Sequence, residues 1–168
     1  MNARLAELAE IPLLNDVEAD ASRVFLAEPD FAFVAQYPLP EEDAYVPFIA
    51  ERRCFVCEAQ EGIVGFVLMG AVDGNGHIFQ VSVRAGSQRR GVGRRLIAAG
   101  EAWAHQQGYE AVTLTTFRDV SWNAPAYARL GYALVSGGAA GPMLLDILEN
   151  EKAIGLFRQV RVAMIKPV

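Results

Sequence analysis

Apolar residues recur along the chain with two periods, and these predict where strands and helices lie. Residues 63–72 form an almost continuous apolar run, which is typical of a buried strand. Residues 91–107 place Leu96, Gly100 and Trp103 on one helical face, and Gly108 ends that helix. The other predicted strands are 55–59, 77–83, 111–117, 132–136 and 159–165, and the other predicted helices are 4–27, 41–52, 123–130 and 143–154.

The order of these elements indicates the fold class. Helices come first, a β-hairpin follows at 55–72, and strands then alternate with helices, which predicts an α/β domain built on a mixed sheet with helices on both faces. Residues 1–4 leave almost no room for a strand before the first helix, so the first edge of the sheet is left open. The strand at 159–165 could pair at a sheet edge in a homodimer. A length of 168 residues favours a single domain, 1–168.

Composition narrows the class of protein. Hydrophobic residues make up 52% and charged residues 21% of the chain, so it is globular, and a net charge of −5 disfavours nonspecific nucleic-acid binding. No signal-peptide pattern is present and no apolar run is long enough to span a bilayer, so we expect a cytoplasmic protein with no membrane partner. Cys54 and Cys57 lack a second pair or a nearby histidine, so we expect no metal site and interpret them as small core or surface residues.

The most informative stretch is 80–93, where an apolar strand ends in a polar turn and a helix begins. Such a turn directs free backbone N–H groups at one point, and the helix dipole adds positive potential, which favours a phosphate. Five of the fifteen basic residues lie between Arg84 and Arg95. The triphosphate loop does not fit because Val92 and Gly93 replace its lysine and hydroxyl, and the dinucleotide fingerprint does not fit because Leu96 replaces its third glycine. The alternative is a solvated, arginine-rich turn.

The sequence Gln88-Arg-Arg-Gly-Val-Gly93 after a strand resembles the pyrophosphate loop of the GNAT acyltransferases, which bind acyl-coenzyme A (acyl-CoA). Residues 111–117 and 123–132 resemble the family's fifth strand and following helix, and the Asp-Val-Ser-Trp-Asn-Ala-Pro-Ala-Tyr segment at 119–127 resembles a bacterial subgroup of it. The resemblance is good over 63–136. It implies a GNAT-type mixed sheet of about six or seven strands, with the fourth and fifth strands splayed around the acyl-CoA arm.

The resemblance also implies which residues bind the cosubstrate, acetyl-CoA. Strand four would pair with the pantetheine arm, and the loop would hold the diphosphate. Asn123 would orient the pantetheine or its phosphate, or serve only as a helix N-cap. The implied cofactor-binding residues are Val81, Ser82, Val83, Gln88, Arg89, Arg90, Gly91, Val92, Gly93 and Asn123.

Two residues match catalytic positions. Tyr127 matches the family's tyrosine acid, since a phenol with a pKa of about 10 can protonate a departing thiolate. The alternative is a buried tyrosine that packs the helix on the sheet. His77 falls where family members carry a strand-four glutamate, and a histidine with a pKa of about 6.5 is suited to accept a proton. The alternative is an exposed histidine beside a turn.

The acceptor is the least defined part of the sequence reading. Asp119 would attract a cationic amine, and Trp122, Phe31 and Tyr37 could line an acceptor site, although aromatic side chains are more often core. The resemblance implies an N-acetyltransferase that acts on a primary amine in a ternary complex, with a small molecule favoured over a peptide. The alternatives are a catalytically silent CoA-binding module on the same fold and a nucleotide-binding protein.

Overall fold

The computed structural model describes residues 2–136 and 138–168. It contains a seven-stranded mixed sheet with strand order β1-β2-β3-β4-β5-β7-β6, in which β4 and β5 are parallel. This confirms the predicted fold class. The strands are β1 (Ala3–Leu5), β2 (Cys54–Ala59), β3 (Gly62–Val72), β4 (Asn75–Val83), β5 (Ala111–Phe117), β6 (Ala133–Leu134) and β7 (Arg161–Pro167).

The α-helices are α1 (Ile11–Ser22), α2 (Val46–Ala50), α3 (Val92–Gln106), α4 (Ala124–Arg129) and α5 (Pro142–Ala153). Short 3-10 helices connect them: η1 (Leu8–Glu10), η2 (Arg23–Ala27), η3 (Pro29–Gln36), η4 (Glu42–Tyr45), η5 (Ala85–Ser87) and η6 (Leu156–Arg158). The chain forms two compact units: unit 1 comprises Met1–Gly70 and Gln80–Trp103, and unit 2 comprises Ala71–Phe79 and Ala104–Val168.

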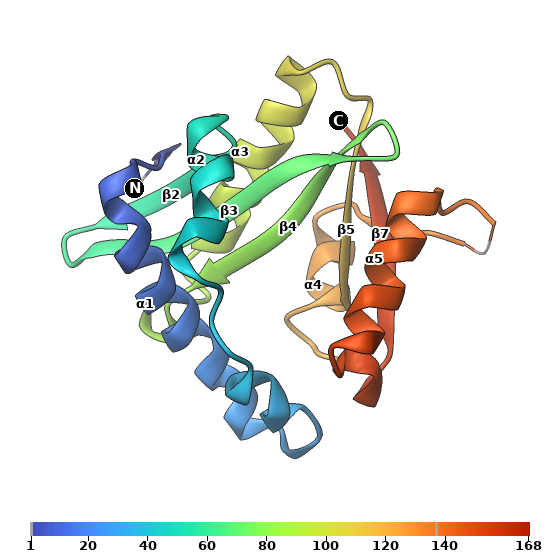
Figure 1. The fold of residues 1–168 in the computed structure, drawn as a ribbon, viewed down its shortest axis with the longest axis horizontal. Coiled ribbons are helices and arrows are strands. Elements are labelled where there is room, and N and C mark those ends of the chain that lie inside the picture. Colours follow the sequence, from blue (N-terminus) through green and yellow to red (C-terminus); the bar gives the residue numbers. More distant parts are fainter. Residues whose placement is uncertain (1, 137) are drawn as a thin grey trace. The chain divides into compact units, whose positions relative to one another are not determined.

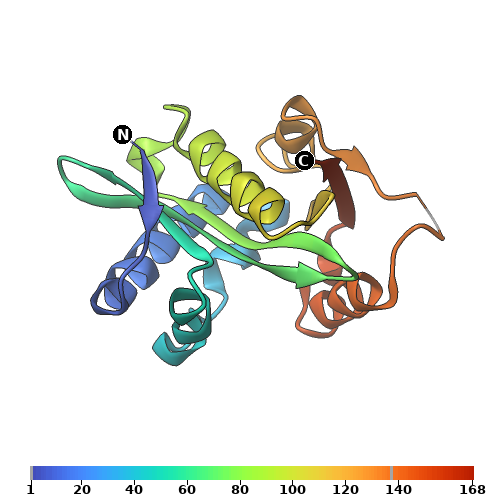
Figure 2. The same ribbon diagram turned by 90° about the horizontal axis from the view of Figure 1, so that it is seen from above.

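In unit 1, helices cover both faces of β1, β2 and β3, with α1 and α2 on one side and α3 on the other (Figure 2). The α1 side buries an apolar core in which the Tyr45 and Phe66 rings meet edge to face at 5.9 Å. The α3 side approaches the sheet closely at Gly65, where an added Cβ would lie 2.8 Å from the Ser82 carbonyl oxygen and 3.0 Å from the Leu96 side chain. Glycine at this position therefore allows α3 to pack on the sheet.

The sequence left the first edge of the sheet open, and the structure has a strand there. Residues 3–5 form strand β1, which pairs antiparallel with β2 from Ala3↔Cys57 to Leu5↔Phe55. The helix predicted from residue 4 begins only at Ile11, and Pro12 lies in its first turn, where its missing N–H is harmless. The helix predicted over 41–52 is a 3-10 turn followed by the short α2.

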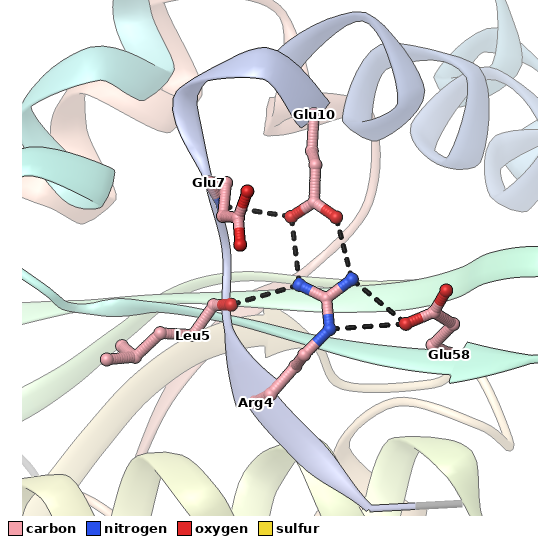
Figure 3. Close-up of polar contacts among 5 residues, drawn as sticks. All are labelled: Arg4, Leu5, Glu7, Glu10 and Glu58. Atoms are coloured by element: carbon pink, nitrogen blue, oxygen red, sulfur yellow. Dashed lines mark hydrogen bonds and ion pairs between the residues drawn. The ribbon is translucent and has the colours of Figure 1, made fainter.

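Arg4 attaches β1 to its surroundings (Figure 3). Its guanidinium donates to the Glu10 carboxylate at 2.7 and 3.0 Å, to Glu58 at 3.0 Å and to the Leu5 carbonyl at 3.1 Å. The Glu10 carboxylate also accepts from the Glu7 backbone N–H at 2.9 Å. The hydrogen bond from Arg4 is the main reason that the pKa of Glu10 lies below its usual value. This network, and not a periodic pattern, holds a three-residue strand in place.

In unit 2, α4 and α5 lie on opposite sides of β5 and β7 (Figure 2). Strand β7 pairs with β5 along its whole length and with β6 at Ala133↔Ile165 and Leu134↔Met164. The predicted final strand is therefore an interior strand, so the expectation that it could offer an edge for a homodimer was wrong.

Helix α5 runs beside β7 (Figure 1), and hydrogen bonds hold it near both of its ends. At its start, the Asp73 carboxylate accepts from the backbone N–H groups of Met143 and Leu144 at 3.0 and 2.8 Å. Near its end, Glu151 forms a two-point ion pair with Arg161 of β7 at 2.7 and 2.9 Å. Asp73 thus replaces a local N-cap, because the helix itself begins after Gly141 and has no side-chain cap of its own.

Candidate active site

The loop that follows β4 is anchored before it turns. The Arg84 backbone N–H donates to the Val64 carbonyl at 2.8 Å, and its side chain donates to the Ile63 carbonyl at 3.0 Å. The Gln88 side-chain amide donates to the Val83 carbonyl at 3.1 Å. From α1, the Asp20 carboxylate accepts from the Ala85 N–H at 2.7 Å. Contacts within unit 1 therefore hold the segment that leads into the turn.

The backbone of the loop leaves a group of donors free. Arg89 and Gly91 have left-handed φ angles of 60° and 78°, and both lie in the turn before α3 begins at Val92. Among the described residues, the backbone N–H groups of 89–93 donate to no protein group. Because these groups lie at the start of a fifteen-residue helix, the dipole and the free donors together favour an anion.

Arginine side chains surround the loop. Arg89, Arg90, Arg94 and Arg95 are exposed, while Val92 is buried and fixes the first turn of α3 to the core. The Arg95 side chain folds back and donates to the Arg90 carbonyl at 3.2 Å. Positive charge and free N–H groups in one short segment suit a compact polyanion such as a diphosphate.

Strand β4 leaves its parallel partner early. Its register with β5 consists of Gly76↔Val112, His77↔Thr113 and Ile78↔Leu114, whereas β4 itself continues to Val83. Val81 and Val83 are half-buried, and Ser82 is buried with its hydroxyl accepting from the Gln80 amide at 2.9 Å. The pairing pattern is the one expected from a fourth strand that diverges from the fifth.

His77 is buried, with 1% of its surface exposed, so the alternative of an exposed histidine beside a turn was wrong. Its Nδ1 lies 2.8 Å from the Thr113 hydroxyl, which in turn donates to the Gly76 carbonyl at 3.3 Å. Because the Thr113 hydroxyl proton is donated to the Gly76 carbonyl, the hydroxyl oxygen accepts from His77. His77 therefore carries its proton on Nδ1, and Nε2 is unprotonated. Burial lowers the pKa of His77 to about 4, which keeps the ring neutral near pH 7.

Tyr127 lies in α4, and its ring packs edge to face on Tyr132 at 5.8 Å. No group in the described part of the chain is hydrogen-bonded to its hydroxyl. Desolvation raises the pKa of Tyr127 to about 12, an effect that the positive charge of Arg161 partly offsets. The phenol is therefore protonated at neutral pH and available as a donor.

The remaining candidate residues have different surroundings. Asn123 occupies the N-cap position of α4, but its side chain makes no capping hydrogen bond; its carbonyl accepts from the N–H groups of Ala126 and Tyr127. Asp119 is exposed and paired with Arg118 at 2.9 Å, which lowers the pKa of Asp119. Phe31 is buried, which favours core, whereas Tyr37 and Trp122 are half-buried.

Sequence reasoning missed two polar clusters. Tyr45 of η4 donates toward Glu18 and Asn15 of α1 at 2.7 and 2.9 Å. Arg161 and Glu151, whose side chains are only 13% and 15% exposed, join Thr115 of β5 in unit 2. No local pattern marks these contacts, because most of the partners lie 27–46 positions apart and only Glu151 and Arg161 are as near as 10.

The described residues contain neither a metal-ligating cluster nor a membrane-spanning helix. No group of three or more metal-ligating side chains is present, and Cys54 and Cys57 are both buried, with burial raising the pKa of Cys54 to about 12. No helix in 2–136 or 138–168 is long and apolar enough to cross a membrane.

The loop, the diverging strand and the helix that follows match a known family. The model of the acetyltransferase (GNAT) family matches residues 19–132, more than half of the chain. The chain belongs to the GNAT acetyltransferase family. On that ground this GNAT protein is an acyltransferase.

Solved structures share this GNAT fold. The PaiA N-acetyltransferase from Thermoplasma acidophilum, solved with coenzyme A, has a TM-score of 0.72 at 12% identity, covering 99% of this chain and 98% of that one. The ribosomal-protein-S18-alanine N-acetyltransferase from Escherichia coli has a TM-score of 0.68 at 17% identity, with coverage of 99% and 93%. The ribosomal-protein-alanine N-acetyltransferase from Brucella melitensis has a TM-score of 0.70 at 15% identity and covers both chains fully, at 100%.

Proposed function

We propose that this GNAT protein transfers an acetyl group from acetyl-CoA to a primary amine by direct attack in a ternary complex. The observation that carries the proposal is the loop at 89–93, whose backbone N–H groups donate to no other described group and are flanked by exposed arginines. A diphosphate needs several donors directed at one point, and this loop supplies them at a helix N-terminus. The residues present therefore fit acetyl-CoA.

The remaining residues of the cofactor site follow from the same geometry. Backbone groups of Val81, Ser82 and Val83 are proposed to pair with the pantetheine arm, since β4 continues past its last pair with β5. The Gln88 side chain stabilises the loop by donating a hydrogen bond to the Val83 carbonyl. Asn123, whose side chain makes no capping bond, is proposed to donate to the pantetheine or its phosphate.

Tyr127 is proposed as the acid that protonates the departing thiolate. Its pKa of about 12 keeps the proton on the phenol across the neutral range, and its hydroxyl is not committed to another described group. General acids of this kind contribute about 10²–10⁴-fold to a rate.

His77 is proposed as the proton acceptor, and its burial limits how strong a base it is. A pKa of about 4 leaves the ring free to accept a proton at neutral pH but makes it a weak base, so its contribution is expected to be smaller than that of Tyr127.

A small-molecule amine is the favoured acceptor, with Asp119, Trp122, Phe31 and Tyr37 as proposed contacts. The subgroup is proposed from the segment 119–127, and we also propose a single functional domain in the cytoplasm. Two of the structurally similar proteins are described as acting on ribosomal-protein alanine, so peptide termini belong in the same acceptor screen.

The test is thiol release from acetyl-CoA with amines, amino acids, polyamines and peptides as acceptors. Tyr127→Phe should reduce turnover about 10²-fold or more while coenzyme A binding is retained. Tyr132→Phe, which removes the hydroxyl of the neighbouring ring, is the matched control. His77→Ala should give a smaller loss. If coenzyme A binds but no acceptor supports release at high protein concentration, the silent CoA-binding module becomes the better description.

A further inference from the structure

Helix α1 carries a carboxylate that the proposed chemistry does not use. Glu18 is half-buried, and its carboxylate accepts from the Tyr45 hydroxyl at 2.7 Å. Desolvation raises the pKa of Glu18, and the hydrogen bond from Tyr45 only partly opposes this. Within the described residues, no arginine or lysine forms an ion pair with it.

Within the described residues, the Glu18 carboxylate accepts a hydrogen bond from one protein group, the Tyr45 hydroxyl. An ionised carboxylate has about four lone-pair positions. Tyr45 is buried, with 1% of its surface exposed, and its hydroxyl can supply a single proton. Asn15, one helical turn earlier on the same face, also contacts the Tyr45 hydroxyl at 2.9 Å, and its side-chain oxygen competes for that proton. The buried phenol therefore holds the carboxylate in place, and the carboxylate can accept further hydrogen bonds.

The charge of the helix favours a cation here. Helix α1 contains Asp16, Glu18 and Asp20 and no basic residue. Asp20 is already used, since it accepts from the Ala85 N–H at the start of the phosphate loop. That bond also shows that α1 contacts the segment leading into the proposed acetyl-CoA site, within the same unit.

We infer that Glu18, with Asn15 beside it and Tyr45 beneath it, binds the ammonium group of the acceptor. That the bound amine is the acetyl acceptor rests on the proposed function, whereas the cation site does not. A partly desolvated carboxylate gains more from an ammonium than an exposed one, because water competes less for it. Helix η3, which carries Phe31 and Phe33, packs against α1, so an aromatic monoamine is a suitable probe.

The experiment compares two probes of the same size by calorimetric titration without acetyl-CoA. 2-Phenylethylammonium carries the charge, and 2-phenylethanol has the same ring and chain without it. We expect the wild-type protein to bind the ammonium about tenfold or more tightly than the alcohol, as a charge-assisted hydrogen bond predicts. Glu18→Gln should reduce this ratio to about one, while Asp16→Asn, an exposed acid on the same helix, should retain it.

Folding and function are separated by further measurements. Glu18→Gln keeps the shape and an acceptor for Tyr45, so its melting temperature should be at or above that of the wild type; a merely structural Glu18 would change stability and leave the ratio intact. If Glu18→Gln does not fold, the wild-type ratio and Glu18→Asp, which keeps the negative charge and should retain a preference for the ammonium, still decide the matter. A wild-type ratio near one, or an unchanged ratio in Glu18→Gln, overturns the inference.

Turnover provides the second comparison. In the acetyl-transfer assay, Glu18→Gln should raise KM for the amine about tenfold and leave KM for acetyl-CoA unchanged. A preserved ammonium preference without any acetyl transfer would refute the proposed function and leave the cation site standing. Acetyl transfer with no dependence on Glu18 would do the reverse.

Discussion

Replacing Gly65 with alanine tests whether the close approach of α3 to the sheet positions the phosphate loop. The added methyl group would lie 2.8 Å from the Ser82 carbonyl oxygen, 3.0 Å from Leu96 and 3.2 Å from Val92. The two side chains can adjust, but the carbonyl oxygen belongs to β4 and cannot rotate away. Ser82 lies just before the loop and Val92 begins the helix after it, so any relief of the clash moves a boundary of the loop.

The expected magnitude follows from overpacking in other cores, which costs about 1–3 kcal/mol. A loss of about 2 kcal/mol in a chain of this length corresponds to a decrease of about 4–8 °C in melting temperature. The lost flexibility of the unfolded chain offsets this by less than about 1 kcal/mol. Coenzyme A should also bind more weakly, because the free N–H groups no longer point at a common position.

The assay is thermal unfolding followed by circular dichroism, with and without coenzyme A. Gly86→Ala is the matched control, since an alanine methyl group there would meet no atom within 4 Å and the backbone is not left-handed. Equal melting temperatures for the two variants would show that the contact at Gly65 is not tight, and the account of how α3 is held would have to be abandoned.

Two further changes test unit 2. The unfolded chain binds a proton at His77 near pH 6.5, whereas the folded protein resists it until about pH 4. The free energy of unfolding should therefore fall by up to roughly 3 kcal/mol as the pH is lowered from about 6.5 toward 4. In urea unfolding, this dependence on pH should be flatter for His77→Asn and the same as in the wild type for His105→Gln. Arg161→Met or Glu151→Met alone should each cost about 3 kcal/mol or more, because one buried charge is left unpaired. The double variant should cost clearly less than the sum, and strict additivity in denaturant unfolding would argue against the pair acting as a unit.

The elements that the sequence predicted well are those with strong local signals. Strand β5 matches its expected bounds, 111–117, because β-branched residues and flanking polar positions mark it without reference to the rest of the fold. The β2–β3 hairpin and the strand, loop and helix around residues 83–92 were found for the same reason. Family resemblance then supplied the roles that local patterns do not contain.

The features that the sequence left open or predicted wrongly are fixed by distant partners. Strand β1 has three residues and is held by pairing with Cys57 and by Arg4 reaching Glu58, which is 54 positions away. His77 lies beside a polar turn, so an exposed histidine was one of two alternatives, and this one was wrong because His77 is buried and contacts Thr113. The position of the final strand between β5 and β6 is likewise a property of topology, which no window of residues encodes.

The place of β7 has a consequence for how the protein is made. Strands β5 and β6 are both translated before the strand that joins them, because β7 begins only at Arg161. A nascent chain that has emerged as far as residue 160 therefore presents two unsatisfied strand edges, and each is open to pairing with another molecule. We expect ribosome-bound or prematurely terminated chains of this length to be the species that chaperones must shield.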